Sequence, residues 1–144
     1  NNYLFSIKKT MRILISLLLL LFINHYSSQD IINKIEGSWQ VKQIDGKIFK
    51  GGVITYFEFN SNQEIFAKTI DHKAHGHLNE ETFIGKYQVD NNEAYYKNNE
   101  AYFSISINKI ANTQKSQMVV EEYKLENQVP KKEVYRTTFL IKEN

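Results

Sequence analysis

The chain has no cysteine, and proline occurs once among its 144 residues. Without cysteine there can be no disulfide scaffold, thiolate zinc site, iron–sulfur cluster, catalytic thiol or lipid-modified cysteine anchor. The length leaves no room for a two-domain enzyme, and a hydrophobic content of 42% argues against a disordered chain. The composition therefore predicts one globular domain, alone or together with a targeting segment.

Excess positive charge is confined to the first part of the chain. The formal net charge is +2, but residues 1–28 hold Lys8, Lys9 and Arg12 and no acidic residue. The rest of the chain carries 15 basic and 16 acidic side chains. The chain therefore lacks the broad basic surface that attracts phosphate backbones, and we expect no nucleic-acid partner.

Long apolar runs are also absent, apart from Ile13–Ile23, which only Ser16 interrupts. Eleven residues are too few to cross a bilayer as a helix, so we expect no transmembrane segment in the mature chain. The preceding Arg12 and the polar residues that follow are typical of a secretory signal peptide over residues 1–28. Met11 would be the initiator and residues 1–10 an over-extended start. We therefore expect export to the periplasm or the extracellular space, the alternative being an uncleaved helix.

Residues 29–144 have the pattern of consecutive short strands that follow a short helix. Apolar residues at Ile31, Ile32 and Ile35 predict one or two helical turns that end at Gly37. Beyond Gly37 the pattern has period two, with turn signals every 8–15 residues and no crossover helix. The expected strands are Ser38–Ile44, Val53–Phe59, Glu64–Ile70, Thr82–Val89, Ala94–Lys97, Ala101–Ile107, Gln117–Leu125 and Glu133–Lys142. This pattern predicts an all-β, single antiparallel up-and-down β-barrel of about eight strands.

A seven-residue tandem repeat covers residues 91–97 and 98–104. A repeat this short cannot be a solenoid unit, and we interpret it as two strands of one hairpin. A carbohydrate platform built from Tyr95, Tyr96 and Tyr102 is the alternative. Alternation along a strand disfavours it, because Tyr95 and Tyr96 would lie on opposite faces.

The residues Gly37-Ser38-Trp39, placed between the short helix and the first strand, resemble the Gly-x-Trp start of lipocalin-like (calycin) barrels. Phe57-Glu58-Phe59 before an Asn-rich turn and Gly85-Lys86-Tyr87 resemble the small lipocalin-like envelope proteins of Gram-negative bacteria. The resemblance implies that the helix closes one end of the barrel and that Trp39 plugs it. It also implies that a basic residue near the C-terminus, here Arg136, stacks on Trp39. Gly37, Trp39 and Arg136 would then have a structural role in closing the barrel.

Three of the four histidines, His72, His75 and His77, fall within six residues between two strands. Imidazoles at this spacing can converge on Zn²⁺ or Cu²⁺, which makes them candidate metal ligands. The competing interpretation is a solvated loop that forms a lid over the barrel mouth.

Signals for catalysis are missing, and we expect no enzymatic activity and no cofactor. No Gly-x-Ser-x-Gly elbow and no Gly-rich phosphate loop are present. The neighbours Glu121 and Glu122 would point to opposite faces of one strand, so they cannot act together on one substrate.

The inner face of an eight-stranded barrel either fills with side chains or holds one small ligand. Alternation places Trp39 there, together with the candidate ligand-lining residues Val41, Thr55, Phe57, Phe59, Phe83, Tyr87, Phe103, Ile105, Ile107, Val120 and Phe139. This mainly apolar lining predicts an exported, non-catalytic binding protein for a small hydrophobic or amphipathic ligand. The alternatives are an envelope protein-interaction domain with a filled barrel and a periplasmic metal-binding protein that uses the His72–His77 loop.

Overall fold

The computed structural model describes residues 14–16, 28–48, 52–71 and 80–143. Residues 28–35 are helical, and eleven strands follow them. The strands are β1 (Gly37–Ile44), β2 (Lys47–Ile48), β3 (Val53–Phe59), β4 (Glu64–Asp71), β5 (Glu80–Lys86), β6 (Gln88–Asp90), β7 (Glu93–Lys97), β8 (Ala101–Lys109), β9 (Ser116–Glu126), β10 (Val129–Pro130) and β11 (Arg136–Lys142).

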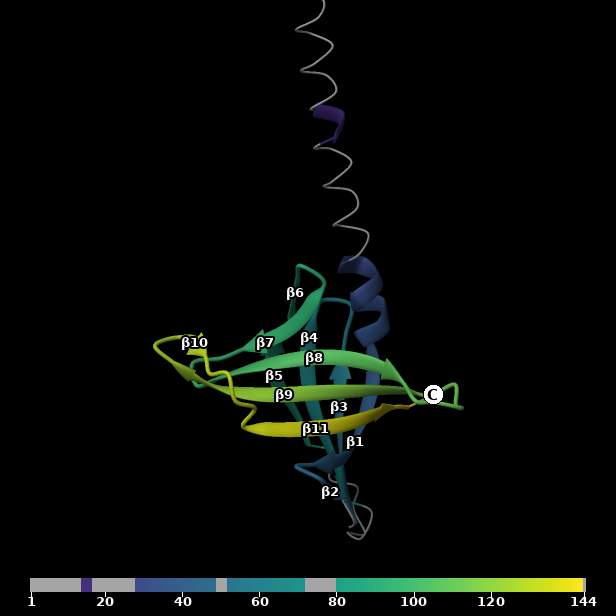
Figure 1. The fold of residues 1–144 in the computed structure, drawn as a ribbon. Helices are drawn as coiled ribbons and strands as arrows, with labels where there is room; N and C mark the ends of the chain where they lie inside the picture. The colour runs from purple at the N-terminus through teal and green to yellow at the C-terminus, as the bar shows by residue number, and fades with distance from the viewer. Residues whose placement is uncertain (1–13, 17–27, 49–51, 72–79, 144) are drawn as a thin grey trace, which may run out of the picture.

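The strands form one antiparallel sheet that curls into a nearly closed barrel (Figure 1). Its order is β5-β4-β3-β1-β11-β9-β8-β7-β6, with β2 beside β1 and β10 beside β9. The two ends of this order, β5 and β6, are separated in sequence by Tyr87 alone. One stretch of chain therefore joins both edges of the sheet, pairing first with β4 and then with β7.

The all-β antiparallel class predicted from the sequence is confirmed, but the strand count of about eight is wrong. Two of the additional strands, β2 and β10, are two-residue arms of hairpins on β1 and β9. The third arises because the expected strand Thr82–Val89 is interrupted at Tyr87, whose backbone N–H donates instead to the Gln63 carbonyl at 2.9 Å.

One end of the barrel is filled with side chains. Trp39 is fully buried there, and its indole Nε1 donates to the Ile35 carbonyl at 2.7 Å, which ties β1 to the last helical residue. Tyr87 and Met118 complete the group, each at most 1% exposed. The ring of Phe59 packs edge-on against Tyr87 with centroids 5.7 Å apart. Burial of these apolar surfaces is the main contribution to stability at this end.

The cation over the Trp39 ring is Lys142, so the expected stacking of Arg136 on Trp39 is wrong. Lys142 is the register partner of Trp39, and its Nζ lies 5.4 Å from the ring centroid. Arg136 begins the same strand six residues earlier, roughly 20 Å away at the usual rise per residue. Gly37 makes room for the lysine, because a Cβ at Gly37 would lie 2.9 Å from Lys142 Cε.

Two β-bulges change which side chains point inward. The register between β1 and β11 shifts between Val41 and Gln43. This bulge reverses the inward and outward positions beyond Lys42, so that Ile44 points into the barrel. The pairing of β4 with β5 shifts in the same way, since Ile65 faces Gly85 while the adjacent Phe66 faces Phe83. Ile84 is the extra residue of this second bulge.

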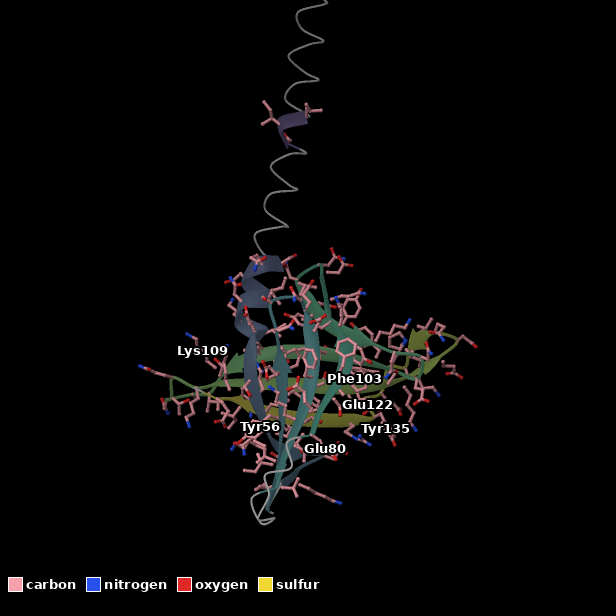
Figure 2. All side chains as sticks on the ribbon, turned by 180° about the vertical axis from the view of Figure 1, so that it is seen from behind. Tyr56, Glu80, Phe103, Lys109, Glu122 and Tyr135 are labelled. Carbon is pink, nitrogen blue, oxygen red and sulfur yellow. The ribbon has the colours of Figure 1, made fainter. Side chains whose placement is uncertain are left out.

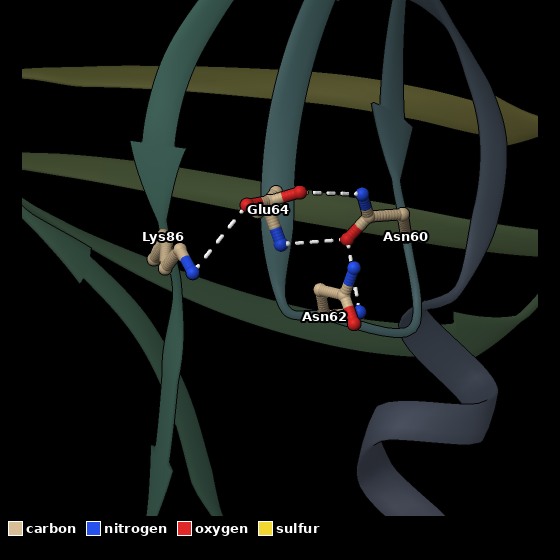
Figure 3. A network of polar contacts seen from close by, with 4 residues as sticks. All are labelled: Asn60, Asn62, Glu64 and Lys86. Carbon is tan, nitrogen blue, oxygen red and sulfur yellow. Dashed lines mark hydrogen bonds and ion pairs between the residues drawn. The ribbon is translucent and has the colours of Figure 1, made fainter.

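The tight turn between β3 and β4 is held by side-chain hydrogen bonds (Figure 3). The Asn60 amide oxygen accepts from the backbone N–H groups of Asn62 and Glu64, and its Nδ2 donates to Glu64 Oε2 at 2.9 Å. This hydrogen bond, followed by the nearby Lys86 ammonium, lowers the pKa of the Glu64 carboxyl despite partial desolvation. Lys86 lies 3.4 Å from Glu64 Oε1 and thereby links the turn to β5.

Candidate ligand-binding cavity

A cavity of about 220 Å³ lies inside the barrel, toward the end of β1 and the start of β11. Trp39 occupies the opposite end of β1, so the barrel has one filled end and one hollow end. The lining is almost entirely apolar. It consists of Ile44, Phe57, Phe59, Ile65, Ile84, Tyr96, Phe103, Ile105, Val120, Glu122, Arg136, Thr138 and Leu140.

Five of the residues expected to line a ligand site do line this cavity: Phe57, Phe59, Phe103, Ile105 and Val120. They lie on β3, β8 and β9, where alternation runs without a bulge through the positions concerned. Four others form no part of the wall. Val41 and Tyr87 are buried in the core, Ile107 packs against it and Thr55 is half-buried on β3.

Phe83 and Phe139 were expected inside the barrel, and both expectations are wrong. The bulge at Ile84 turns Phe83 outward, where it is 54% exposed and its ring lies 5.4 Å from that of Phe66. On β11 the inward side chains are Arg136, Thr138 and Leu140, so Phe139 points outward. The sequence misled here because the outward positions of β11 are the more apolar set.

Tyr96 is a lining residue that alternation did not assign to the cavity. Its ring stacks on Phe103 with centroids 5.5 Å apart and planes 27° apart. Its hydroxyl donates to the Ile84 carbonyl at 3.0 Å, across the seam where β5 and β7 are not paired. A Cβ on Gly85 would lie 2.5 Å from Tyr96 Cε2, so the ring closes the seam only because residue 85 has no side chain.

Among the residues that the structure describes, a cross-strand pair, Glu122 on β9 and Arg136 on β11, supplies the charged groups of the wall. Arg136 Nη1 lies 3.7 Å from Glu122 Oε2, and the two side chains are 46% and 18% exposed. Tyr135 flanks the pair, since its backbone N–H donates to the Glu122 carbonyl at 2.7 Å and its ring lies 5.6 Å from the Arg136 guanidinium. Figure 2 shows Phe103, Glu122 and Tyr135 on the same side of the barrel.

Glu121, the neighbour of Glu122 in the sequence, lies on the other face of β9, as alternation requires. It accepts a hydrogen bond from the Tyr123 hydroxyl at 2.8 Å on the outer surface. The cavity wall thus carries one carboxylate and one guanidinium beside each other on an apolar surface. Such an arrangement can orient a polar group of a ligand while the apolar wall excludes water from the rest.

The metal-ligand candidates His72, His75 and His77 lie outside the described residues. Within the described residues, no group of three or more acidic or histidine side chains is placed to hold a metal ion. In the same part of the chain, no helix has the length and apolar character needed to cross a membrane.

Comparison with known proteins gives no relative: no protein-family model, no curated protein and no solved structure matches this chain. A functional assignment must therefore start from the chain's own geometry. That geometry is an all-β, nearly closed antiparallel barrel with one filled end and an apolar cavity toward the other.

Proposed function

We propose that the protein is an exported, non-catalytic binding protein of the lipocalin-like type, which holds a small amphipathic ligand in the barrel. The observation that carries this proposal is the apolar cavity of about 220 Å³ with the Glu122–Arg136 pair in its wall. A barrel that served only as a scaffold would gain stability from filling this space, because an internal void forfeits packing energy.

The size of the cavity limits the ligand. An apolar protein cavity of roughly 150 Å³ stays dry and binds benzene, whereas pockets for drug-sized ligands begin at roughly 300 Å³. At about 220 Å³ the cavity suits one ring or a short alkyl chain. The exposed guanidinium of Arg136 suits a carboxylate at one end of such a molecule, since planar donors match carboxylate oxygens.

A larger side chain at Val120 is expected to abolish this binding. We expect a medium-chain alkanoate, tested as hexanoate, octanoate and decanoate by isothermal titration calorimetry, to bind the unmodified protein. Val120→Phe places a ring inside the cavity and should weaken binding at least tenfold, about 1.4 kcal/mol. Val119→Phe is the matched control, because Val119 lies beside Val120 on the outer face of β9.

Two outcomes would contradict the binding function. Absence of heat with all three alkanoates at two well-separated temperatures would contradict the binding function and favour the protein-interaction domain, because apolar binding that is silent at one temperature releases or absorbs heat at another. An equal loss of affinity in Val120→Phe and Val119→Phe would show that the substitution acts through stability and not through the cavity. Thermal unfolding of both variants separates a binding defect from a folding defect.

Export is the second part of the proposal and has its own test. When the full chain is expressed in a Gram-negative host, we expect the product in the periplasm or the medium to begin near Gln29. N-terminal sequencing measures this start directly. An intact N-terminus on the exported product, or retention in the cytoplasm, would contradict a cleaved signal over residues 1–28.

A further inference from the structure

Three tyrosines form a row on the outer face of the barrel, on β7, β8 and β9 in turn. The rings of Tyr95 and Tyr102 are stacked, with centroids 5.3 Å apart and planes 23° apart. The ring of Tyr123 follows at 6.2 Å from that of Tyr102, its direct register partner. These strands lie side by side (Figure 1), and the row uses none of the residues that line the cavity. We call Tyr95, Tyr102 and Tyr123 the tyrosine row.

Hydrogen bonds hold the ends of the tyrosine row in place. Tyr95 Oη donates to Gln88 Oε1 at 2.7 Å, and Tyr123 Oη donates to Glu121 Oε2 at 2.8 Å. The bond to Glu121 raises the pKa of the Tyr123 phenol, and burial together with the charge of Glu93 raises that of Tyr102. The hydrogen bonds at both ends and the stacking of Tyr95 on Tyr102 hold the rings in place, so they lose little entropy when a ligand stacks on them.

A surface hollow of about 380 Å³ adjoins the tyrosine row. Tyr102 and Tyr123 contribute two aromatic side chains to its lining. Its polar lining residues are Asn92, Glu93, Ser104 and Lys131. The remaining lining residues are Pro130 and Ile105, and Ile105 also belongs to the wall of the cavity. Aromatic rings beside closely spaced donors and acceptors suit a molecule that has C–H groups on one face and hydroxyls around its rim.

We propose that the tyrosine row and its hollow bind a neutral saccharide. The C–H face of a sugar ring can lie on a tyrosine ring, while its hydroxyls exchange hydrogen bonds with Asn92, Glu93 and Ser104. A phosphorylated or otherwise anionic ligand fits less well, because Glu93 and Glu121 carry negative charge and the Lys131 ammonium already lies 3.4 Å from Glu126 Oε2. A lipid chain fits less well because the hollow has polar groups in its wall.

The test uses five neutral oligosaccharides: the pentasaccharides of cellulose, chitin, laminarin, xylan and maltodextrin. Saturation-transfer difference NMR and calorimetric titration are made with the purified protein. We expect at least one of the five to bind with a Kd of millimolar or below. Tyr123→Leu should weaken that binding at least fivefold, since it keeps an apolar side chain but removes the aromatic face.

Three further variants make the result specific. Tyr56→Leu is the matched control, because Tyr56 lies on β3, which pairs with none of β7, β8 and β9 (Figure 2). Ser104→Ala leaves the tyrosine row intact and should weaken binding by removing one hydroxyl. Val120→Phe fills the cavity and should leave saccharide binding unchanged, which separates this site from the proposed ligand in the barrel.

The proposal is overturned if none of the five saccharides binds, or if Tyr123→Leu and Tyr56→Leu lower the affinity equally. Loss of saccharide binding in Val120→Phe would move the sugar into the barrel and would also overturn the outer site. If circular dichroism shows that Tyr123→Leu is unfolded, the Ser104→Ala variant is the decisive one. An unchanged saccharide affinity in Ser104→Ala would then contradict a binding site in the hollow.

Discussion

Replacing Trp39 with alanine is expected to lower the free energy of unfolding by about 3–5 kcal/mol, as large-to-small changes of buried aromatic residues do. Trp39 is fully buried at the filled end of the barrel, and its Nε1 bonds to the Ile35 carbonyl at 2.7 Å. The change would therefore leave a cavity and an unpaired carbonyl together. Small domains have only about 5–15 kcal/mol of stability in total, so much of it would be lost. Urea denaturation followed by far-ultraviolet circular dichroism measures the effect.

Trp39→Phe separates the two contributions of the indole. It keeps an aromatic ring against Lys142 and the core but removes the Nε1 donor, so we expect a smaller loss of about 1–2 kcal/mol. Arg136→Ala should leave the packing around Trp39 unchanged, because Lys142 is the cation above the ring. A cost below about 1 kcal/mol for Trp39→Ala would contradict the view that this residue closes the barrel.

Gly85→Ala is expected to destabilise the barrel by about 1–3 kcal/mol, although it adds a single methyl group. The added Cβ would lie 2.5 Å from Tyr96 Cε2, and Gly85 has a φ of +155°, which L residues rarely adopt. Tyr96 cannot yield freely, because Phe103 stacks on its ring and its hydroxyl bonds to the Ile84 carbonyl. Chemical denaturation gives the loss of stability. The seam between β5 and β7 should also open, which faster amide hydrogen exchange would report.

The double variant with Tyr96→Leu shows whether this clash is the cause. In a Tyr96→Leu background the ring is gone, so Gly85→Ala should cost at least about 1 kcal/mol less than it does alone, a coupling within the usual range for residues in contact. Equal costs in the two backgrounds would mean that backbone strain at Gly85, and not the approach of Tyr96, makes glycine necessary here.

These two variants concern the filled end of the barrel and the seam between β5 and β7. The end with Trp39 is packed tightly and contributes stability, while the end with Arg136 leaves space inside. Tyr96 is part of the cavity wall and also bridges the seam where β5 and β7 are not paired. A destabilised seam would therefore alter access to the cavity as well as folding. For this reason we expect Gly85→Ala to weaken the proposed alkanoate binding in addition to lowering stability.

The amino-acid sequence by itself determined the class of fold and the position of most strands. Period-two alternation of apolar residues between turn signals is a local property, and it identified β1, β3, β4, β7, β8 and β9 within one or two residues. The tight turns are also a local property of the sequence, because Asp45 and Asn91 adopt the positive φ that their residue types tolerate. The same local rule correctly separated Tyr95 from Tyr96, which lie on the outer and inner faces.

Only the tertiary structure decided which side chains line the cavity. A bulge reverses the alternation of every residue after it, and both bulges arise from pairing between strands, which no short stretch of sequence reveals. Ile44 and Ile84 thereby enter the wall, and Phe83 leaves it. Pairing between strands also decides that Lys142, and not Arg136, lies over Trp39, since the register of β1 and β11 places Lys142 opposite Trp39. The tyrosine row likewise requires Tyr123, twenty-one residues beyond Tyr102 in sequence and directly opposite it in the sheet. Contacts between distant strands depend on the free energy of the whole sheet, and a local pattern does not contain that information.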